Sequence, residues 1–490
     1  MVVVHFGESG WFGRFDTSFT EKALYSVAKT FCAQLARVKG ASRRVFVAFD
    51  TRPESRARAQ LFCVILNDLN VAVDISPASV PHPIAAWFAQ THPYDIAIMF
   101  SGADYRSDYG GMQFCASRFE YLPRVLTEAL DGQIEDDIPE DLLSRAHAPL
   151  LAGIACDPVP LYTRSFQDFM ASLPKDLQPS SSSSSVPDLS RAPFVLDSMH
   201  GAVGTLAAQL LSHEGYHTLS CRTDAREDFG GIHPAPMKPW TRVPAQTLLV
   251  HKAHLAVSYD GIGMRQSFID EKGSTIPLHM AAPIILDYLV RVCGKSGRVV
   301  TTQASSIRLS RMAHELGLEC EVVPVGYEHI LDEIKEGDVL LAADEYAGIT
   351  IPSFSFARDA LLASALFANA LRASALSASE LVRTMSIRLG HMDYIRKDMA
   401  LDAAKMQSFS IMLPGVNPKT IAGKVPCSVS HADGLHLSFD DGSWVMLRPS
   451  RTQSTVRIYA EADSTKARNV LLHAAYELSL IHISEPTRLL

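Results

Sequence analysis

The chain has 490 residues, of which 47% are hydrophobic and 20% charged, and its formal net charge is −8. This length accommodates three or four compact domains, and the composition is typical of a soluble globular protein. The negative balance argues against a broad surface for nucleic acid or anionic membranes, so we expect neither as a partner, and any anionic ligand must be held by a local cluster of cations.

Cysteine usage and the first residues indicate a cytoplasmic protein. The eight cysteines are scattered and form no CxxC pair, which favours free thiols in a reducing compartment. Residues 1–7 have no basic region and too short an apolar run for a signal peptide. No run of about 18 apolar residues occurs, so we expect no membrane span.

Short apolar or β-branched runs, each followed by a turn and a helical pattern, recur along much of the chain. Strand–helix alternation of this kind predicts βαβ units with largely parallel sheets. We therefore expect three repeated α/β domains, over residues 1–150, 151–283 and 284–395. The runs that carry this prediction are residues 44–50, 194–197 and 298–302.

The second predicted domain contains an unusual insert between Pro174 and Pro193, with consecutive serines from Ser180 to Ser185. Such a segment buries too little apolar area to order itself. We expect a disordered surface loop, and phosphorylation there is the alternative role.

The C-terminal part has a different pattern. Residues 434–440 alternate apolar and polar side chains, and Asp441 and Gly442 then turn the chain into the apolar run 444–447. This is a hairpin signal, which predicts a smaller α+β domain over residues 396–477. Residues 478–490 read like a translated sequencing adapter, so we expect a foreign tail there and a missing natural C-terminus. A natural short tail is the alternative.

Four segments, in chain order, resemble the α-D-phosphohexomutase family, which includes phosphoglucomutases and phosphomannomutases. The resemblance spans Phe6 to about Glu477. Residues 6–13 are similar to the family's FGTSGWRG, residues 197–202 to its DxMHGA, residues 229–236 to its FGGxxPEP and residues 448–459 to its RPSGTEPxxRxY.

This resemblance implies four domains around a central cleft, each of which contributes one loop. It also implies a reaction that interconverts hexose 1- and 6-phosphates. A phosphoserine in the first loop gives its phosphoryl group to a sugar phosphate, and the bisphosphate intermediate reorients and returns a phosphoryl group from its other end. Magnesium bound by the second loop assists the transfer.

The first loop departs from the family pattern TASHNPxxYNGxK at the residues that perform the chemistry. The serine position falls on Ala103, the histidine position on Asp104 and the lysine position on Gln113. A methyl group cannot carry a phosphoryl group, and an amide is not a base near neutral pH. We therefore expect no catalytic residue in this loop. Ser101 and Ser107 flank the position, but a two-residue shift moves a side chain by about 6–7 Å.

The second loop, DGDxDR in the family, has lost two of its three metal-binding carboxylates. Only Asp260 remains, because Ile262 and Met264 occupy the other two positions. One carboxylate is a poor Mg²⁺ site, so we expect a vestigial Asp260 that pairs with Arg265 or caps the turn. No cofactor is expected, and Mg²⁺ only if the protein is active.

The third and fourth loops keep more of the family pattern. In the third, GEESGG in the family, Asp344 and Glu345 are candidates for sugar binding, while Tyr346 replaces a small serine and would fill part of the sugar site or stack on another ring. In the fourth loop, the guanidinium groups of the arginines and the side-chain hydroxyls suit a phosphate dianion. The alternative is a basic loop with nothing bound. The candidate phosphate-binding residues are Arg448, Ser450, Thr452 and Arg457.

Three hypotheses follow. The leading one is an inactive or impaired family member that retains binding of a hexose phosphate or sugar bisphosphate and has a regulatory role, with an active mutase or another protein as a partner. The second is an active mutase that uses Ser101 or another route for the phosphoryl group. The third is an interaction protein whose cleft is closed by Tyr346 and Met264. The altered third loop leaves the sugar unidentified.

Overall fold

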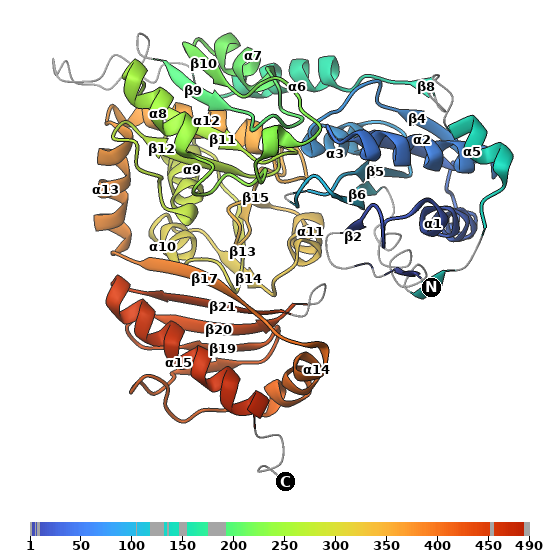
Figure 1. Ribbon diagram of the computed structural model, residues 1–490. Helices are drawn as coiled ribbons and strands as arrows, with labels where there is room; N and C mark the ends of the chain where they lie inside the picture. Colours follow the sequence, from blue (N-terminus) through green and yellow to red (C-terminus); the bar gives the residue numbers. More distant parts are fainter. Residues whose placement is uncertain are drawn as a thin grey trace.

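The computed structural model describes residues 2–4, 6, 10–103, 105–117, 132–134, 137–146, 154–174, 193–450 and 455–484. They form three sheets of one repeated topology and a fourth, antiparallel sheet near the C-terminus (Figure 1). The predicted fold class, three α/β units with largely parallel sheets and a smaller α+β unit, is confirmed. Residues 175–192, which contain the predicted serine-rich loop, lie outside the described residues.

The first sheet has six strands in the order β2-β6-β5-β3-β4-β8, and β1 and β7 form a separate antiparallel ribbon. β3, β4, β5 and β8 are parallel, whereas β6 and β2 run antiparallel to their neighbours. The strands are β1 (Val2–Val4), β2 (Trp11–Arg14), β3 (Arg44–Phe49), β4 (Ala72–Ile75), β5 (Ile96–Phe100), β6 (Tyr109–Ser117), β7 (Gly132–Ile134) and β8 (Ile154–Ala155). The accompanying helices are α1 (Glu21–Leu35), α2 (Pro53–Asp68), α3 (His82–Thr91), α5 (Glu140–Ala146) and α6 (Val159–Ala171).

The second and third sheets repeat the central part of the first. The order β4-β3-β5-β6 recurs as β10-β9-β11-β12 and as β14-β13-β15-β16, each time with three parallel strands and one antiparallel edge strand. The second sheet contains β9 (Phe194–Asp197), β10 (Thr218–Cys221), β11 (Leu255–Tyr259) and β12 (Gln266–Asp270). The third contains β13 (Arg298–Thr302), β14 (Cys320–Val323), β15 (Val339–Ala343) and β16 (Ile349–Thr350).

This repeat explains why three distant sequence motifs meet. In each unit a tight connection joins the third parallel strand to the antiparallel strand beside it, and these connections are residues 101–108, 260–265 and 344–348. All three begin at the carboxyl end of a buried parallel strand. Loops at that edge of a parallel sheet are where α/β folds build binding sites.

Helices join the second and third sheets into one core. α12 (Ala360–Ser374) follows the third sheet but packs on the second, where Phe367 stacks on Phe268 with ring centroids 4.1 Å apart. The Tyr216 hydroxyl also donates to Asn369 of α12 (2.6 Å). The other helices of this region are α7 (Leu206–His213), α8 (Arg242–His251), α9 (Ala281–Arg291), α10 (Arg308–Glu315), α11 (Tyr327–Glu336) and α13 (Ala378–Leu389).

The fourth sheet is antiparallel throughout, in the order β17-β21-β20-β19-β18, and α14 and α15 pack on it. The predicted hairpin is confirmed, since Leu435 pairs with Leu447 across β19 and β20. α15 continues through Ser484, so the segment interpreted as a foreign tail begins within a helix. The elements are β17 (Asp393–Ala400), α14 (Ala403–Met412), β18 (Ser428–Ser430), β19 (Leu435–Ser438), β20 (Trp444–Pro449), β21 (Thr455–Ala462) and α15 (Thr465–Ser484).

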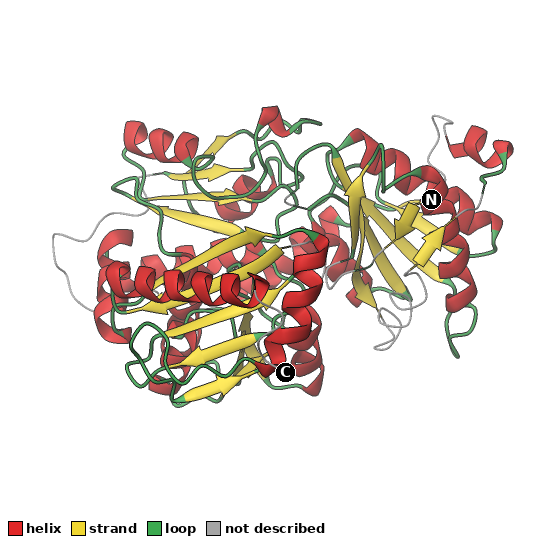
Figure 2. Ribbon diagram, turned by 60° about the horizontal axis from the view of Figure 1, so that its bottom comes forward, coloured by secondary structure: helices red, strands yellow, loops and turns green. Residues whose placement is uncertain are grey.

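Figure 2 shows helices on the outer faces of the strands, with the N-terminal sheet standing to one side of the other three. Within the described part of the chain, no single helix is both long and apolar enough to cross a membrane. The bent pair α12 and α13 meets the length and composition test only when both are taken together, with 85° between them.

Candidate functional site

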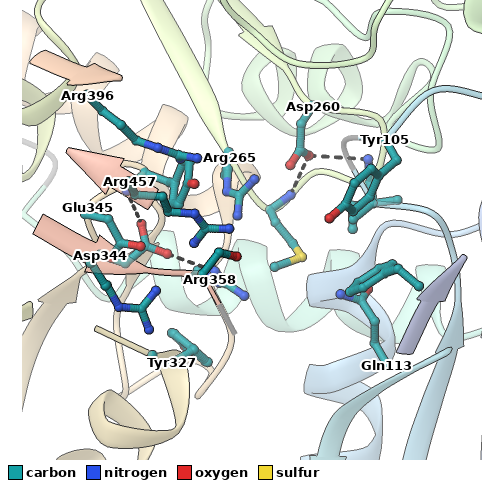
Figure 3. A pocket seen from close by; sticks show the side chains of 18 of the residues that line it. Tyr105, Gln113, Asp260, Arg265, Tyr327, Asp344, Glu345, Arg358, Arg396 and Arg457 are labelled. Atoms are coloured by element: carbon teal, nitrogen blue, oxygen red, sulfur yellow. Dashed lines mark hydrogen bonds and ion pairs between the residues drawn. The ribbon is translucent and has the colours of Figure 1, made fainter. Parts of the chain in front are cut away.

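A cleft of about 320 Å³ lies where the four units meet (Figure 3). The three equivalent connections contribute to it, together with β17, β20 and β21 of the fourth sheet. Its lining residues are Phe12, Ala103, Tyr105, Gln113, His233, Asp260, Ile262, Met264, Arg265, Gly326, Tyr327, Asp344, Glu345, Tyr346, Arg358, Arg396, Arg448, Ser450 and Arg457. All the predicted site residues within the described part of the chain therefore lie in one place. Thr452 and Asp104 lie outside the described residues.

The first connection presents a methyl group to the cleft. Ala103 has a left-handed backbone (φ 47°), and its amide donates to the Ser101 hydroxyl oxygen (2.8 Å). Ser101 is fully buried and donates its own proton to Asp50 (2.7 Å). Ser101 therefore shapes the loop from beneath and has no access to a ligand in the cleft. The geometry does not favour Ser101 as an alternative nucleophile.

A buried arginine that the sequence analysis missed holds this connection in place. Arg52, at the start of α2, forms an ion pair with Asp50 and donates to the carbonyls of Ala103 (3.3 Å) and Tyr105 (2.5 Å). Its guanidinium also lies 4.7 Å from the centroid of the Phe229 ring, which belongs to the second unit. The signal in the sequence is an acid that ends the predicted strand 44–50 and an arginine two residues after it.

In the second connection, Asp260 caps its own turn. One carboxylate oxygen accepts from the backbone amides of Met264 (2.9 Å) and Ile262 (3.3 Å), and the residue is 2% exposed. The aliphatic side chains that replace the other two acids are buried as well. Among the residues that the structure describes, no group of three His, Cys, Asp or Glu side chains could hold a metal ion. This donor set does not fit Mg²⁺, which requires near-octahedral oxygen coordination.

The acids of the third connection are engaged within the protein. Asp344 forms an ion pair with Arg358 (2.8 Å) and accepts from the amides of Tyr346 (2.9 Å) and Gly348 (2.8 Å). Glu345 accepts from the Thr302 hydroxyl (3.1 Å). Burial and then the nearby Asp344 carboxylate raise the pKa of Glu345. Both acids line the cleft, as predicted, but Asp344 has fewer free lone pairs for sugar hydroxyls than the sequence suggests.

Tyr346 lies between two guanidinium groups. Arg265 and Arg396 each lie 4.5 Å from the centroid of its ring, one from the second unit and one from β17. Stacking of this kind is favourable because the ring face is negative. The tyrosine thus stacks, but on cations instead of another ring. Tyr346 and Met264 both line a cleft of about 320 Å³, which does not support the third hypothesis, in which these two side chains close it.

In the fourth sheet, Arg448 and Arg457 lie directly opposite each other on β20 and β21. Arg448 is 1% exposed; its Nε donates to Asp433 (2.5 Å) and its Nη2 to the Val325 carbonyl (3.3 Å). Arg457 forms no ion pair with any described residue, and its Nε is buried without a hydrogen-bond partner among them. Like charges placed opposite each other on a sheet repel. Asp433 pairs with Arg448, and Asp398 of β17 lies opposite Arg457 on the other side of β21, so part of this repulsion is already offset. An anion bound at Arg457 would satisfy its buried Nε donor.

Comparisons with known proteins agree with this architecture. Residues 3–139 match the family model "phosphoglucomutase/phosphomannomutase, alpha/beta/alpha domain I", and residues 279–387 match the corresponding model for domain III. Phosphoglucosamine mutase of Caldicellulosiruptor saccharolyticus is 22% identical over 94% of this chain and 94% of its own length.

Solved structures share the fold along nearly the whole chain. A structure assigned to a phosphomannomutase of Thermus thermophilus superposes with a TM-score of 0.79 at 22% identity and covers 97% of this chain and 99% of its own. The N-acetylphosphoglucosamine mutase of Aspergillus fumigatus, solved with GlcNAc-6P and magnesium, has a TM-score of 0.55 at 11% identity and covers 97% of this chain and 96% of its own.

Proposed function

Because the chain belongs to the α-D-phosphohexomutase family, we propose that it binds a hexose phosphate in its central cleft and does not transfer phosphoryl groups. The observation that carries the proposal is the lining of the cleft itself. The same cavity that holds a cluster of arginines presents the methyl group of Ala103 and the amide of Gln113 where the family has its nucleophile and its lysine.

The binding half of the proposal is supported by the cations. Five arginines line the cleft, and two of them are already neutralised by carboxylates, Arg358 by Asp344 and Arg448 by Asp433. Arg457 has no such partner within the described residues. A phosphate dianion suits a half-buried guanidinium, which can hold it through two parallel N–H···O bonds.

The second half is supported by three independent losses. Ala103 has no oxygen to phosphorylate, and the nearest serine in its loop is buried beneath it. Gln113 carries no charge. Asp260 is committed to two backbone amides, and the described residues place it in no group of acids that could hold a metal ion. Transfer of a phosphoryl group depends almost entirely on positioning and charge neutralisation, so the loss of these groups together removes its basis.

The aspergillus mutase was solved with GlcNAc-6P and magnesium. We propose that this chain shares with it the sugar phosphate and not the metal. We further infer a cytoplasmic, regulatory role, in which the protein acts alone or with an active mutase as its partner.

A phosphorus-31 NMR time course tests the proposal. The full chain is mixed with Mg²⁺, glucose 1,6-bisphosphate and the 1-phosphates of glucose, mannose and glucosamine. We expect no new 6-phosphate resonance, and selective broadening of at least one sugar phosphate that Arg457→Gln abolishes. An active phosphoglucomutase in the same mixture is the positive control. New 6-phosphate resonances would refute the inactivity, and an unbroadened spectrum would refute the binding.

A further inference from the structure

The cleft has two ends of opposite chemistry. Arginines gather at the end formed by the third and fourth sheets, whereas Tyr105 and Gln113 face them from the first sheet (Figure 3). All the described residues that the first sheet and its connections contribute to the lining are uncharged, namely Phe12, Ala103, Tyr105 and Gln113. Asp104 lies outside the described residues. The second unit adds the apolar Ile262 and Met264 to the lining, together with His233, Asp260 and Arg265.

The uncharged end is held in a defined geometry. The rings of Phe12 and Tyr105 have centroids 5.4 Å apart at 39°, and Tyr105 stacks on Tyr109 at 5.2 Å and 17°. Phe12 lies against Gly111, where an added Cβ would come within 2.5 Å of the phenyl ring. This end therefore presents aromatic faces that need little reorganisation to receive a ligand, which lowers the cost of binding.

The same end is unsuited to a second phosphate. Neither Arg52, which donates to the first connection, nor Arg106 within that connection lines the cleft. Arg52 is fully buried and engaged with Asp50 and two carbonyls. The acid Asp260 lines the cleft close to Tyr105 (Figure 3). A phosphate placed there would lose its hydration without gaining a cation and would be repelled by an acid.

We propose that the ligand is a phosphate monoester whose opposite end carries an uncharged aromatic ring. This inference rests on the proposed function, and it adds the chemistry of the part of the ligand remote from the phosphate. The phosphate binds at Arg457, and the ring lies against Phe12 and Tyr105. A cleft of about 320 Å³ is at the lower end of the range for small-molecule sites, so a sugar phosphate with one additional ring fills it.

Isothermal titration of the full chain with four probes tests this. The probes are glucose 6-phosphate, phenyl β-glucoside 6-phosphate, glucose 1,6-bisphosphate and uridine 5′-monophosphate. We expect the phenyl glucoside phosphate to bind at least about tenfold more tightly than glucose 6-phosphate, because aromatic contacts of this kind contribute about one such factor. We expect the bisphosphate to bind no more tightly than glucose 6-phosphate. If the uridine nucleotide is the tightest, the ring is a nucleobase; if the glucoside is, the ring is an aglycone, and both results support the proposal.

A matched pair of variants locates the two ends. Phe12→Leu keeps an apolar side chain but removes the ring, and it should reduce the preference for the phenyl compound to less than about threefold. Arg457→Gln should weaken all the probes together. Binding of glucose 6-phosphate without any preference for a ring, or a tighter bisphosphate, would overturn this inference and leave the proposed function intact. Failure of every probe to bind would overturn both.

Discussion

His279 offers a test of how the third connection is held. Its Nε2 lies 2.9 Å from the carbonyl oxygen of Glu345, and its ring packs edge-on against Tyr394 of β17 at 4.4 Å. The residue is 8% exposed. Burial lowers the pKa of His279 from its ordinary 6.5 to about 4. The folded protein thus keeps a neutral imidazole at a pH where the unfolded chain binds a proton.

This lowered pKa of His279 determines the direction and size of the change in protein stability with pH. Above pH 6.5 the histidine is neutral in both states, and its contribution to stability is fully present. As the pH falls from 6.5 towards about 4, the unfolded chain gains a proton that the folded protein does not, so stability is lost. Each pKa unit is equivalent to about 1.4 kcal/mol. The free energy of unfolding therefore falls by about 2 kcal/mol at about pH 5, and by about 3 kcal/mol when the pH reaches the folded-state pKa.

The assay is urea unfolding at about pH 7.5 and about pH 5, applied to the wild type and to His279→Gln. Glutamine keeps an N–H donor for the Glu345 carbonyl and does not titrate. We expect the stability difference between the two proteins to change by about 2 kcal/mol in favour of the variant at the lower pH. His82, whose pKa burial lowers to about 3, is present in both proteins and cancels. Parallel pH profiles would refute the reasoning.

Three further predictions concern the cleft. Ala103→Ser should restore no mutase turnover in the NMR assay, because the uncharged Gln113 and the single acid of the second connection remain; turnover from this change alone would contradict the proposed function. Tyr346→Leu should lower the free energy of unfolding by about 2 kcal/mol, measured by calorimetry, since two guanidinium stacks are lost. Tyr346→Phe should leave the free energy of unfolding within about 0.5 kcal/mol of the wild type because its ring still stacks. Equal losses in both variants would mean that stacking contributes nothing to stability. Arg457→Gln should weaken glucose 6-phosphate binding at least about tenfold by titration without lowering the melting temperature; unchanged affinity would exclude Arg457 from the phosphate site.

The sequence determined the fold through patterns that are local in the chain. The strand predictions at 194–197 and 298–302 coincide with β9 and β13, and the hairpin at 434–447 is β19 and β20. Hydrophobic periodicity and turn residues act over a few positions, so they can be read without knowing what packs against them. The sequence alone also placed Ala103 and Gln113 in a cleft, through the order and spacing of the family motifs.

Only the tertiary structure decided which way each side chain faces and what it contacts. Ser101 and Ala103 are two residues apart, yet the left-handed φ of Ala103 turns one into the core and the other into the cleft. Tyr346 contacts Arg265 and Arg396, which lie far from it in the chain and belong to the second and fourth units. A loop side chain has no period from which its direction can be inferred, and a stack of three residues from three units forms only when the units pack together. The chemistry of this cleft was therefore decided by packing between units.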